Sequence, residues 1–153
     1  MKRRYLFTLE ITPLDVGTTY DELPSHLTLM SRFFSELGPE QITAAVYPLF
    51  AASRPIELHF GDVIELGSKK LLVHTVNHLD VLASLHESLR TLLDSIIVEY
   101  EYPQFMGENH KPHVTKREGA LFDAGSPKVT TAAYLIEIVD GKRVVRSKLD
   151  LTG

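Results

Sequence analysis

Apolar, β-branched and aromatic residues gather in short runs separated by turn-forming residues, and this pattern predicts a chain rich in strands. Strands are expected at residues 5–12, 26–34, 56–66 and 70–76, and then at 111–117, 128–139 and 143–151. The Gly-Asp pair at residues 61–62 predicts a bulge or turn, whereas Gly67-Ser68 and Asp140-Gly141 predict hairpins. Residues 19–22 are compatible with the start of a short helix.

Two longer stretches have the spacing of helices. Residues 79–97 place apolar side chains on one stripe, formed by Leu82, Leu85, Leu89, Leu92, Leu93 and Ile96. Residues 39–52 begin with a proline, which favours a helix start, but Pro48 falls inside the apolar pattern and is expected to kink or end that helix. Strands interleaved with two helices and closed by a hairpin predict an α+β or mixed α/β domain.

Length and composition describe an ordinary globular domain. The 153 residues are expected to form one domain, residues 1–153, with 44% apolar and 24% charged residues. The net charge of −4 argues against binding of long nucleic acid through an extended basic surface. A few local cations could still hold a small phosphate ligand. The absence of cysteine excludes disulfides, thiolate nucleophiles and Cys-ligated metals.

No stretch of the sequence reads as a membrane span. The basic N-terminal stretch is interrupted by Thr8 and Glu10, and no later apolar run approaches the roughly 20 residues that a span requires. We therefore expect a cytoplasmic monomer with no membrane partner.

Two triplets carry the candidate chemistry. His26 and Thr28 flank a leucine, and His113 and Thr115 flank a valine, each triplet having a proline just upstream. Residues i and i+2 of a strand project from the same face. Each histidine should therefore share a face with its threonine, while the apolar residue between them points into the core.

Cations follow both triplets. Continuing by twos, Met30 and Arg32 follow the first triplet, whereas Lys116 and Arg117 come directly after the second. A phosphate between the two strands would meet two imidazoles, two hydroxyls and up to two guanidinium groups. Taken singly, Arg32 and Arg117 are better explained as surface charges near strand ends.

The other histidines form weaker patterns. His86 and Ser88 lie two apart on the long helix, where their side chains point about 200° apart and cannot share a site, so His86→Ala is expected to keep near-normal activity. His74 and His78 are four apart, but a strand is expected to end there, which removes helical metal-ligand spacing. We expect no metal site and no cofactor. Tyr134 is expected to pack in the core.

The two triplets resemble the paired motifs of the two-histidine phosphoesterase superfamily, which includes the 2′-5′ RNA ligase-like proteins and cyclic phosphodiesterases. The resemblance covers residues 5–149 and includes the order of strands and helices. It implies a bilobed, pseudo-symmetric α+β fold, with two antiparallel sheets around a central groove and helices on the outside. It also implies that the catalytic residues are His26, Thr28, His113 and Thr115, with substrate contacts from Arg32, Lys116 and Arg117.

These residue types suit the hydrolysis of a 2′,3′-cyclic or 2′-5′ phosphodiester of a nucleotide or RNA end. One imidazole can activate water and the other can protonate the leaving ribose oxygen, without a metal. Hydroxyls and cations can stabilise the charge of the transition state. Which histidine is the base, and the direction of the reaction, stay open. The alternatives are a non-catalytic nucleotide or RNA-end binding protein that keeps the groove, and a protein whose histidines are structural.

Overall fold

The structure is a computed structural model that describes residues 1–66, 71–76, 79–115 and 127–153. Its described helices are α1 (Pro39–Ala51) and α2 (Leu79–Ser95), with two short 3-10 helices, η1 (Pro103–Phe105) and η2 (Gly107–Asn109). Its described strands are β1 (Arg3–Glu10), β2 (Thr19–Tyr20), β3 (His26–Ser35), β4 (Ile56–Leu66), β5 (Leu71–Val76), β6 (Glu99–Tyr100), β7 (His113–Thr115), β8 (Pro127–Thr130), β9 (Ala132–Val139) and β10 (Lys142–Asp150).

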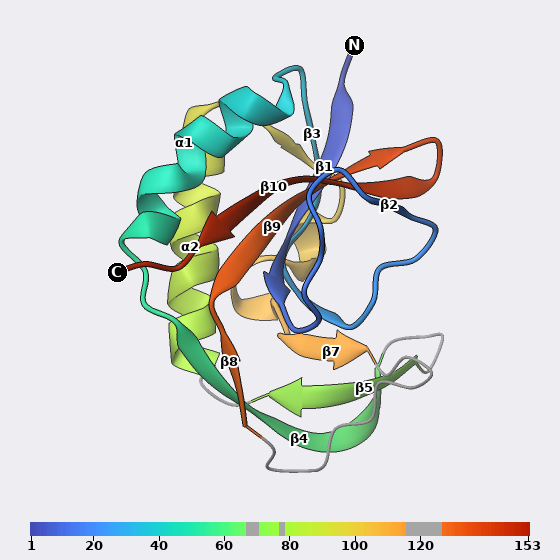
Figure 1. The fold of residues 1–153 in the computed structure, drawn as a ribbon, viewed down its shortest axis with the longest axis vertical. Helices are drawn as coiled ribbons and strands as arrows, with labels where there is room; N and C mark the ends of the chain where they lie inside the picture. The colour runs from blue at the N-terminus through green and yellow to red at the C-terminus, as the bar shows by residue number, and fades with distance from the viewer. Residues whose placement is uncertain (67–70, 77–78, 116–126) are drawn as a thin grey trace.

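Antiparallel pairing connects all ten described strands into one sheet. Its order is β2-β10-β9-β1-β3-β7-β5-β4-β8, and β6 pairs with β3 beside this path. One half of the sheet holds β1, β3 and the C-terminal hairpin, whereas the other holds β5, β4 and β8 (Figure 1). The two halves meet where β3 pairs with β7, at Leu27 and Val114.

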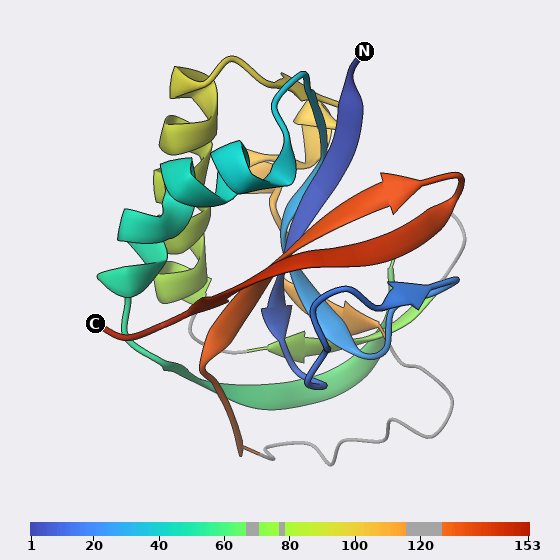
Figure 2. The same ribbon diagram turned by 45° about the horizontal axis from the view of Figure 1, so that its top comes forward.

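Both helices lie on the same side of the sheet (Figures 1 and 2). Their buried side chains join those of the central strands in the main hydrophobic core, which includes Phe7, Leu27, Phe50 and Leu89. A second, smaller cluster gathers against β9 and contains Leu6, Leu14, Leu23, Tyr134, Ile136 and Val145. The sheet therefore separates the helical core from a second face.

Leu27 and Val114 decide which way the motif side chains point. Both are 0% exposed and belong to the main core beneath the helices. Since neighbouring residues in a strand point to opposite faces, His26, Thr28 and His113 project from the face away from the helices.

The period-two pattern of β3 breaks directly after the first triplet. The register with β1 shifts there, so that Leu29 has no partner in β1. Leu29 and Met30 are both buried in the main core, which corrects the expectation that Met30 follows Thr28 onto the groove face. The next buried core residue after Met30 is Phe33, three positions later, where strict alternation would give two. Because of this second break in the alternation, Arg32 lies on the same side as Thr28, and both border one cavity.

The α+β class predicted from the sequence is confirmed. The two expected sheets are continuous with one another, and their pseudo-symmetry and the single domain of residues 1–153 stay predictions. The predicted bulge occurs as a register shift between Phe60 and Val63. Asp140 and Gly141 both have positive φ, 51° and 77°, the geometry of a tight hairpin turn. No described helix is long and apolar enough to cross a membrane.

Several details of the sequence prediction are wrong. Residues 19–22 contain strand β2, which pairs with β10, in place of a helix start. Pro48 does not end α1, because its carbonyl accepts a hydrogen bond from the Ala52 N–H at 3.1 Å. The predicted strand 128–139 is divided at Thr131, since β8 pairs with β4 whereas β9 pairs with β1 and β10. The predicted Gly67-Ser68 hairpin and His78 lie outside the described residues.

Leu27→Ala is expected to lower the free energy of unfolding by about 2–5 kcal/mol, the usual cost of truncating a fully buried leucine. Urea unfolding curves measure this loss. Leu79→Ala is the matched control, because Leu79 is 55% exposed at the start of α2, and it should change stability by less than about 0.5 kcal/mol. Equal losses in the two variants would contradict the central place of Leu27.

Candidate functional site

The strand register brings the two triplets together. Because Leu27 and Val114 are paired in antiparallel strands, Thr28 is placed beside His113, and His26 beside position 115. Two triplets that are distant in the sequence thus occupy neighbouring strands. The side chains of His26, Thr28 and His113 share one face of the sheet.

Each motif histidine makes the same contact with the backbone. His26 Nδ1 lies 2.8 Å from the carbonyl oxygen of Pro24, and His113 Nδ1 lies 2.7 Å from that of Lys111, two residues upstream in both cases. A carbonyl oxygen only accepts hydrogen bonds, so the Nδ1–H group is the donor in both rings. The neutral form of each ring therefore carries its lone pair on Nε2.

A buried carboxylate lies on the other side of the first triplet. Glu10 of β1 is opposite His26 in the register and is 8% exposed. Its carboxylate accepts a hydrogen bond from the Tyr134 hydroxyl, which accepts one from the Leu14 N–H at 3.0 Å. Burial, followed by the bond to Glu10, raises the pKa of Tyr134 to about 12, so this hydroxyl stays protonated at neutral pH. Tyr134 packs in the second apolar cluster, in agreement with the sequence analysis.

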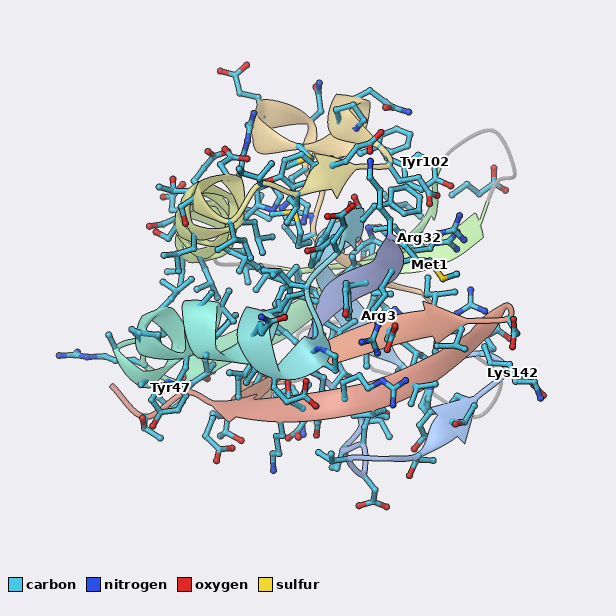
Figure 3. The ribbon with its side chains drawn as sticks, turned by 90° about the horizontal axis from the view of Figure 1, so that it is seen from above. Met1, Arg3, Arg32, Tyr47, Tyr102 and Lys142 are labelled. Atoms are coloured by element: carbon cyan, nitrogen blue, oxygen red, sulfur yellow. The ribbon has the colours of Figure 1, made fainter. Side chains whose placement is uncertain are left out.

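A cavity of about 240 Å³ opens beside the first triplet. His26, Thr28 and Arg32 contribute to its wall, together with Tyr102 and Arg143 from later parts of the chain. Figure 3 labels Arg32 and Tyr102, whose side chains lie close together. Tyr102 and Arg143 were not predicted from the sequence, because only the tertiary fold brings them to β3.

Arg32 is held in place by an acidic neighbour. Its guanidinium Nη1 lies 3.6 Å from a carboxylate oxygen of Glu101, and the same carboxylate pairs with Arg4 at 3.0 Å. Two cations thus share one carboxylate. The net charge of Arg4, Arg32 and Glu101 is positive, and the wall of the adjoining cavity also contains Arg143 and the carboxylate of Glu22.

A second cavity, of about 360 Å³, lies beside His113. Its wall includes the apolar side chains of Ile64, Val73 and Leu79 together with Thr75 and His113. The two motif histidines therefore border separate cavities, and the one beside His113 is the more apolar of the two. The two triplets lie on the paired strands β3 and β7, next to these two cavities.

The second triplet is only partly described. The backbone of Thr115 belongs to β7, but its side chain and all of Lys116 and Arg117 lie outside the described residues. Their predicted roles in catalysis and substrate binding stay predictions.

His86 was expected to be a control residue whose replacement keeps near-normal activity, but its position makes it unsuitable for that purpose. It is 1% exposed, and its Nδ1–H donates to the carbonyl of Leu29 at 2.7 Å. Replacing it would disturb the strand that carries the first triplet. His59 makes a better control, because 40% of its side chain is exposed and it pairs with Glu57 at 3.0 Å.

Size does not mark the candidate site. A cavity of about 710 Å³, larger than either cavity beside the triplets, lies over α1 and β10, and the described part of its wall contains none of the predicted site residues. Within the described ranges, no three His, Asp or Glu side chains are grouped to hold a metal ion. The catalytic residue types gather at the two triplets.

A family model identifies the kind of protein. Residues 10–138, which include both triplets, match the model of the 2′-5′ RNA ligase superfamily. The chain therefore belongs to this superfamily of two-histidine phosphoesterases and 2′-5′ RNA ligase-like enzymes, and the resemblance drawn from the two triplets is confirmed. A comparison with curated proteins finds no match.

Solved structures share the fold at low sequence identity. A Thermus thermophilus protein is 17% identical with a TM-score of 0.61, and 98% of each chain is covered. A protein described as a phosphoesterase is 15% identical, and E. coli LigT complexed with 3′-AMP is 16% identical; both have a TM-score of 0.62 and cover 100% of both chains. These likenesses show the fold.

The ring contacts predict the tautomers of four histidines. At alkaline pH, His26, His86 and His113 should carry their proton on Nδ1, because each Nδ1 faces a carbonyl oxygen. His110 should carry it on Nε2, which lies 3.2 Å from the carbonyl oxygen of Thr28. Long-range ¹H–¹⁵N NMR spectra distinguish the two forms. An Nε2–H proton on neutral His26 or His113 would contradict the orientation of the candidate site.

Proposed function

We propose that this protein is a metal-independent phosphoesterase that hydrolyses a 2′,3′-cyclic or 2′-5′ phosphodiester of a nucleotide or RNA end. The observation that carries the proposal is the matched pair of histidines on neighbouring strands. His26 and His113 share a sheet face, and each has its Nδ1–H bonded to a backbone carbonyl. Each ring can therefore use Nε2 for proton transfer.

The two histidines divide the proton transfers. One neutral imidazole takes a proton from water as the water oxygen attacks phosphorus, and the other, protonated, gives its proton to the leaving ribose oxygen as the P–O bond breaks. A cyclic phosphate then becomes a phosphomonoester, and one proton has moved through each ring. The Nδ1 contacts with the carbonyls of Pro24 and Lys111 hold the rings in orientation during both steps. Either histidine can take either role.

Hydroxyls and cations can stabilise the negative charge on the phosphoryl oxygens. Thr28 lies beside His113 in the register and borders the same cavity as Arg32. Both can donate to the non-bridging oxygens, whose negative charge increases in the transition state. We assign the same role to Thr115, whose backbone position is beside His26, and substrate contacts to Lys116 and Arg117.

Ligands of a structural relative agree with a nucleotide substrate. E. coli LigT is known in complexes with 3′-AMP, ATP and phosphate. The cavity with Arg32, Tyr102 and Arg143 can take an anionic, planar ligand, since guanidinium groups pair with phosphates and aromatic rings stack on bases. A monomer without cofactor stays our expectation.

His26→Ala and His113→Ala are each expected to lower kcat by about 10² to 10⁴, the usual contribution of a positioned acid or base. Thr28→Val should cost about 10² to 10³, because it removes one donor to the transition state. The wild-type pH profile should be bell-shaped, since one ring must be neutral and the other protonated. Initial rates on nucleoside 2′,3′-cyclic phosphates and 2′-5′ oligonucleotides, with EDTA present, measure these effects.

The exposed histidine His59 supplies the control for these variants. His59→Ala should retain wild-type kcat, because its side chain is paired with Glu57 on the surface of β4. Full activity in His26→Ala or His113→Ala would remove the paired mechanism, and loss of activity in EDTA would indicate a metal. Tight nucleotide binding without any turnover would favour the non-catalytic binding protein.

Arg32→Ala is expected to raise KM about 10-fold with a smaller effect on kcat, the low end of the range for a hydrogen bond to a charged group. Its cavity also contains His26 and Thr28, so the lost guanidinium would have contacted substrate. Lys142→Ala is the matched control, because Lys142 pairs with Asp21 at 3.2 Å on the surface and both side chains are exposed. Equal KM values in the two variants would contradict a substrate contact at Arg32.

A further inference from the structure

Two further histidines, absent from the proposed mechanism, lie stacked beneath the candidate site. His86 belongs to α2 and His110 follows η2, three residues before His113. Their ring centroids are 4.1 Å apart and the ring planes differ by 9°. His86 is 1% exposed, and His110 borders the apolar cavity beside His113.

Each ring holds a carbonyl of the first motif strand. His110 Nε2 lies 3.2 Å from the carbonyl oxygen of Thr28, and His86 Nδ1 lies 2.7 Å from that of Leu29. These two carbonyls are consecutive and directly follow the first triplet. Both ring nitrogens must carry hydrogen, because a carbonyl only accepts.

This part of β3 needs such donors because, among the described residues, neither β6 nor β7 is paired with it at Thr28 and Leu29. β7 is paired with β3 at Leu27, and β6 at Phe33 and Phe34, among the residues that the structure describes. The register shift also leaves Leu29 without a partner in β1. A buried carbonyl without a donor costs about 1–3 kcal/mol. The two imidazoles therefore replace a strand along this stretch.

A third hydrogen bond ties the pair to the segment that leads into the second triplet. The Gly107 N–H donates to His86 Nε2 at 3.2 Å, so both nitrogens of His86 are used and the ring is neutral. Gly107 has φ of +62°, a backbone conformation that glycine adopts readily. The same segment continues to His110 and then to Lys111, whose carbonyl orients His113. Both ends of the site are thus connected through the stacked rings.

Charge favours this arrangement. Burial, and next the neighbouring His86, lower the pKa of His110 to about 4. At neutral pH the His110 ring is therefore uncharged, and the hydrogen bond from the Gly107 N–H requires a lone pair on His86 Nε2, so the two rings stack at 4.1 Å without repulsion. A protonated ring here would face the second imidazole without any carboxylate among its hydrogen-bond partners.

We propose that His86 and His110 are positioning residues that hold the first motif strand and the segment before His113 at a fixed separation, and so set the geometry between the two catalytic histidines. The inference rests on the proposed function. We assign the pair no contact with the reacting atoms, and it acts through the carbonyls of Thr28 and Leu29. A displacement of about 1 Å between reacting groups can cost about 10² in rate, so such a support has a large effect on kcat.

The test uses His110, because it is only partly buried and its replacement threatens the fold less than that of His86. His110→Gln keeps an N–H donor near the position of Nε2, whereas His110→Leu keeps the volume and loses the donor. We expect His110→Leu to lower kcat about 10- to 100-fold with KM within about 3-fold of wild type. His110→Gln should restore kcat to within about 3-fold of wild type. Urea unfolding confirms that each variant is folded under the assay conditions.

A readout that does not depend on turnover separates this inference from the proposed function. The ring NMR signals of His26 and His113 should shift in His110→Leu and stay near wild type in His110→Gln. Equal kcat in the two folded variants, or unchanged ring signals in His110→Leu, would overturn the positioning role. If the wild-type protein is inactive on every phosphodiester tested, the proposed function fails. The ring NMR signals of His26 and His113 in the His110 variants then test the positioning role of His86 and His110 on their own. Should His110→Leu fail to fold, His110→Met takes its place.

Discussion

The pairing of Leu27 with Val114 is the constraint on which the candidate site depends. It joins the two halves of the sheet, and it does so with the middle residues of the two triplets. Both side chains are fully buried under the helices. Hydrophobic burial on one face therefore forces the flanking histidines and Thr28 onto the other. A slip of one residue in this register would turn the polar residues into the core, so the same apolar contact that stabilises the fold also assembles the site.

Backbone carbonyls orient the two histidine rings that the strand register brings together. A histidine ring can rotate about its side-chain bonds and can exchange its proton between two nitrogens, so proximity alone does not define a catalyst. The carbonyls of Pro24 and Lys111 remove both freedoms at His26 and His113. They bind Nδ1–H and leave the lone pair of the neutral ring on Nε2, the nitrogen to which we assign proton transfer. In both triplets the carbonyl lies two residues upstream of the histidine, so the same local hydrogen bond orients the ring in both strands.

Much of this arrangement was predictable from local sequence, and the failures have identifiable causes. Period-two alternation correctly put His26 and Thr28 on the same side of their strand, where both border one cavity, since that rule follows from strand geometry. It failed at Met30, because the register shift at Leu29 is imposed by the neighbouring strand and has no local signal. Helical spacing showed that His86 and Ser88 cannot share a site, but it gave no indication that His86 is buried against β3.

Residues that reach the site from distant elements were missed for the same reason. Glu10 is opposite His26 only through the pairing of β1 with β3, and Tyr102 approaches Arg32 only in the folded chain. Histidines also occupy two environments here. His26 and His113 are partly exposed, whereas His86 is buried and the pKa of His110 is lowered to about 4 by desolvation. Burial keeps His110 neutral, whereas His26 and His113 stay in contact with solvent. These two environments differ in desolvation, which the three-dimensional fold determines and sequence spacing does not.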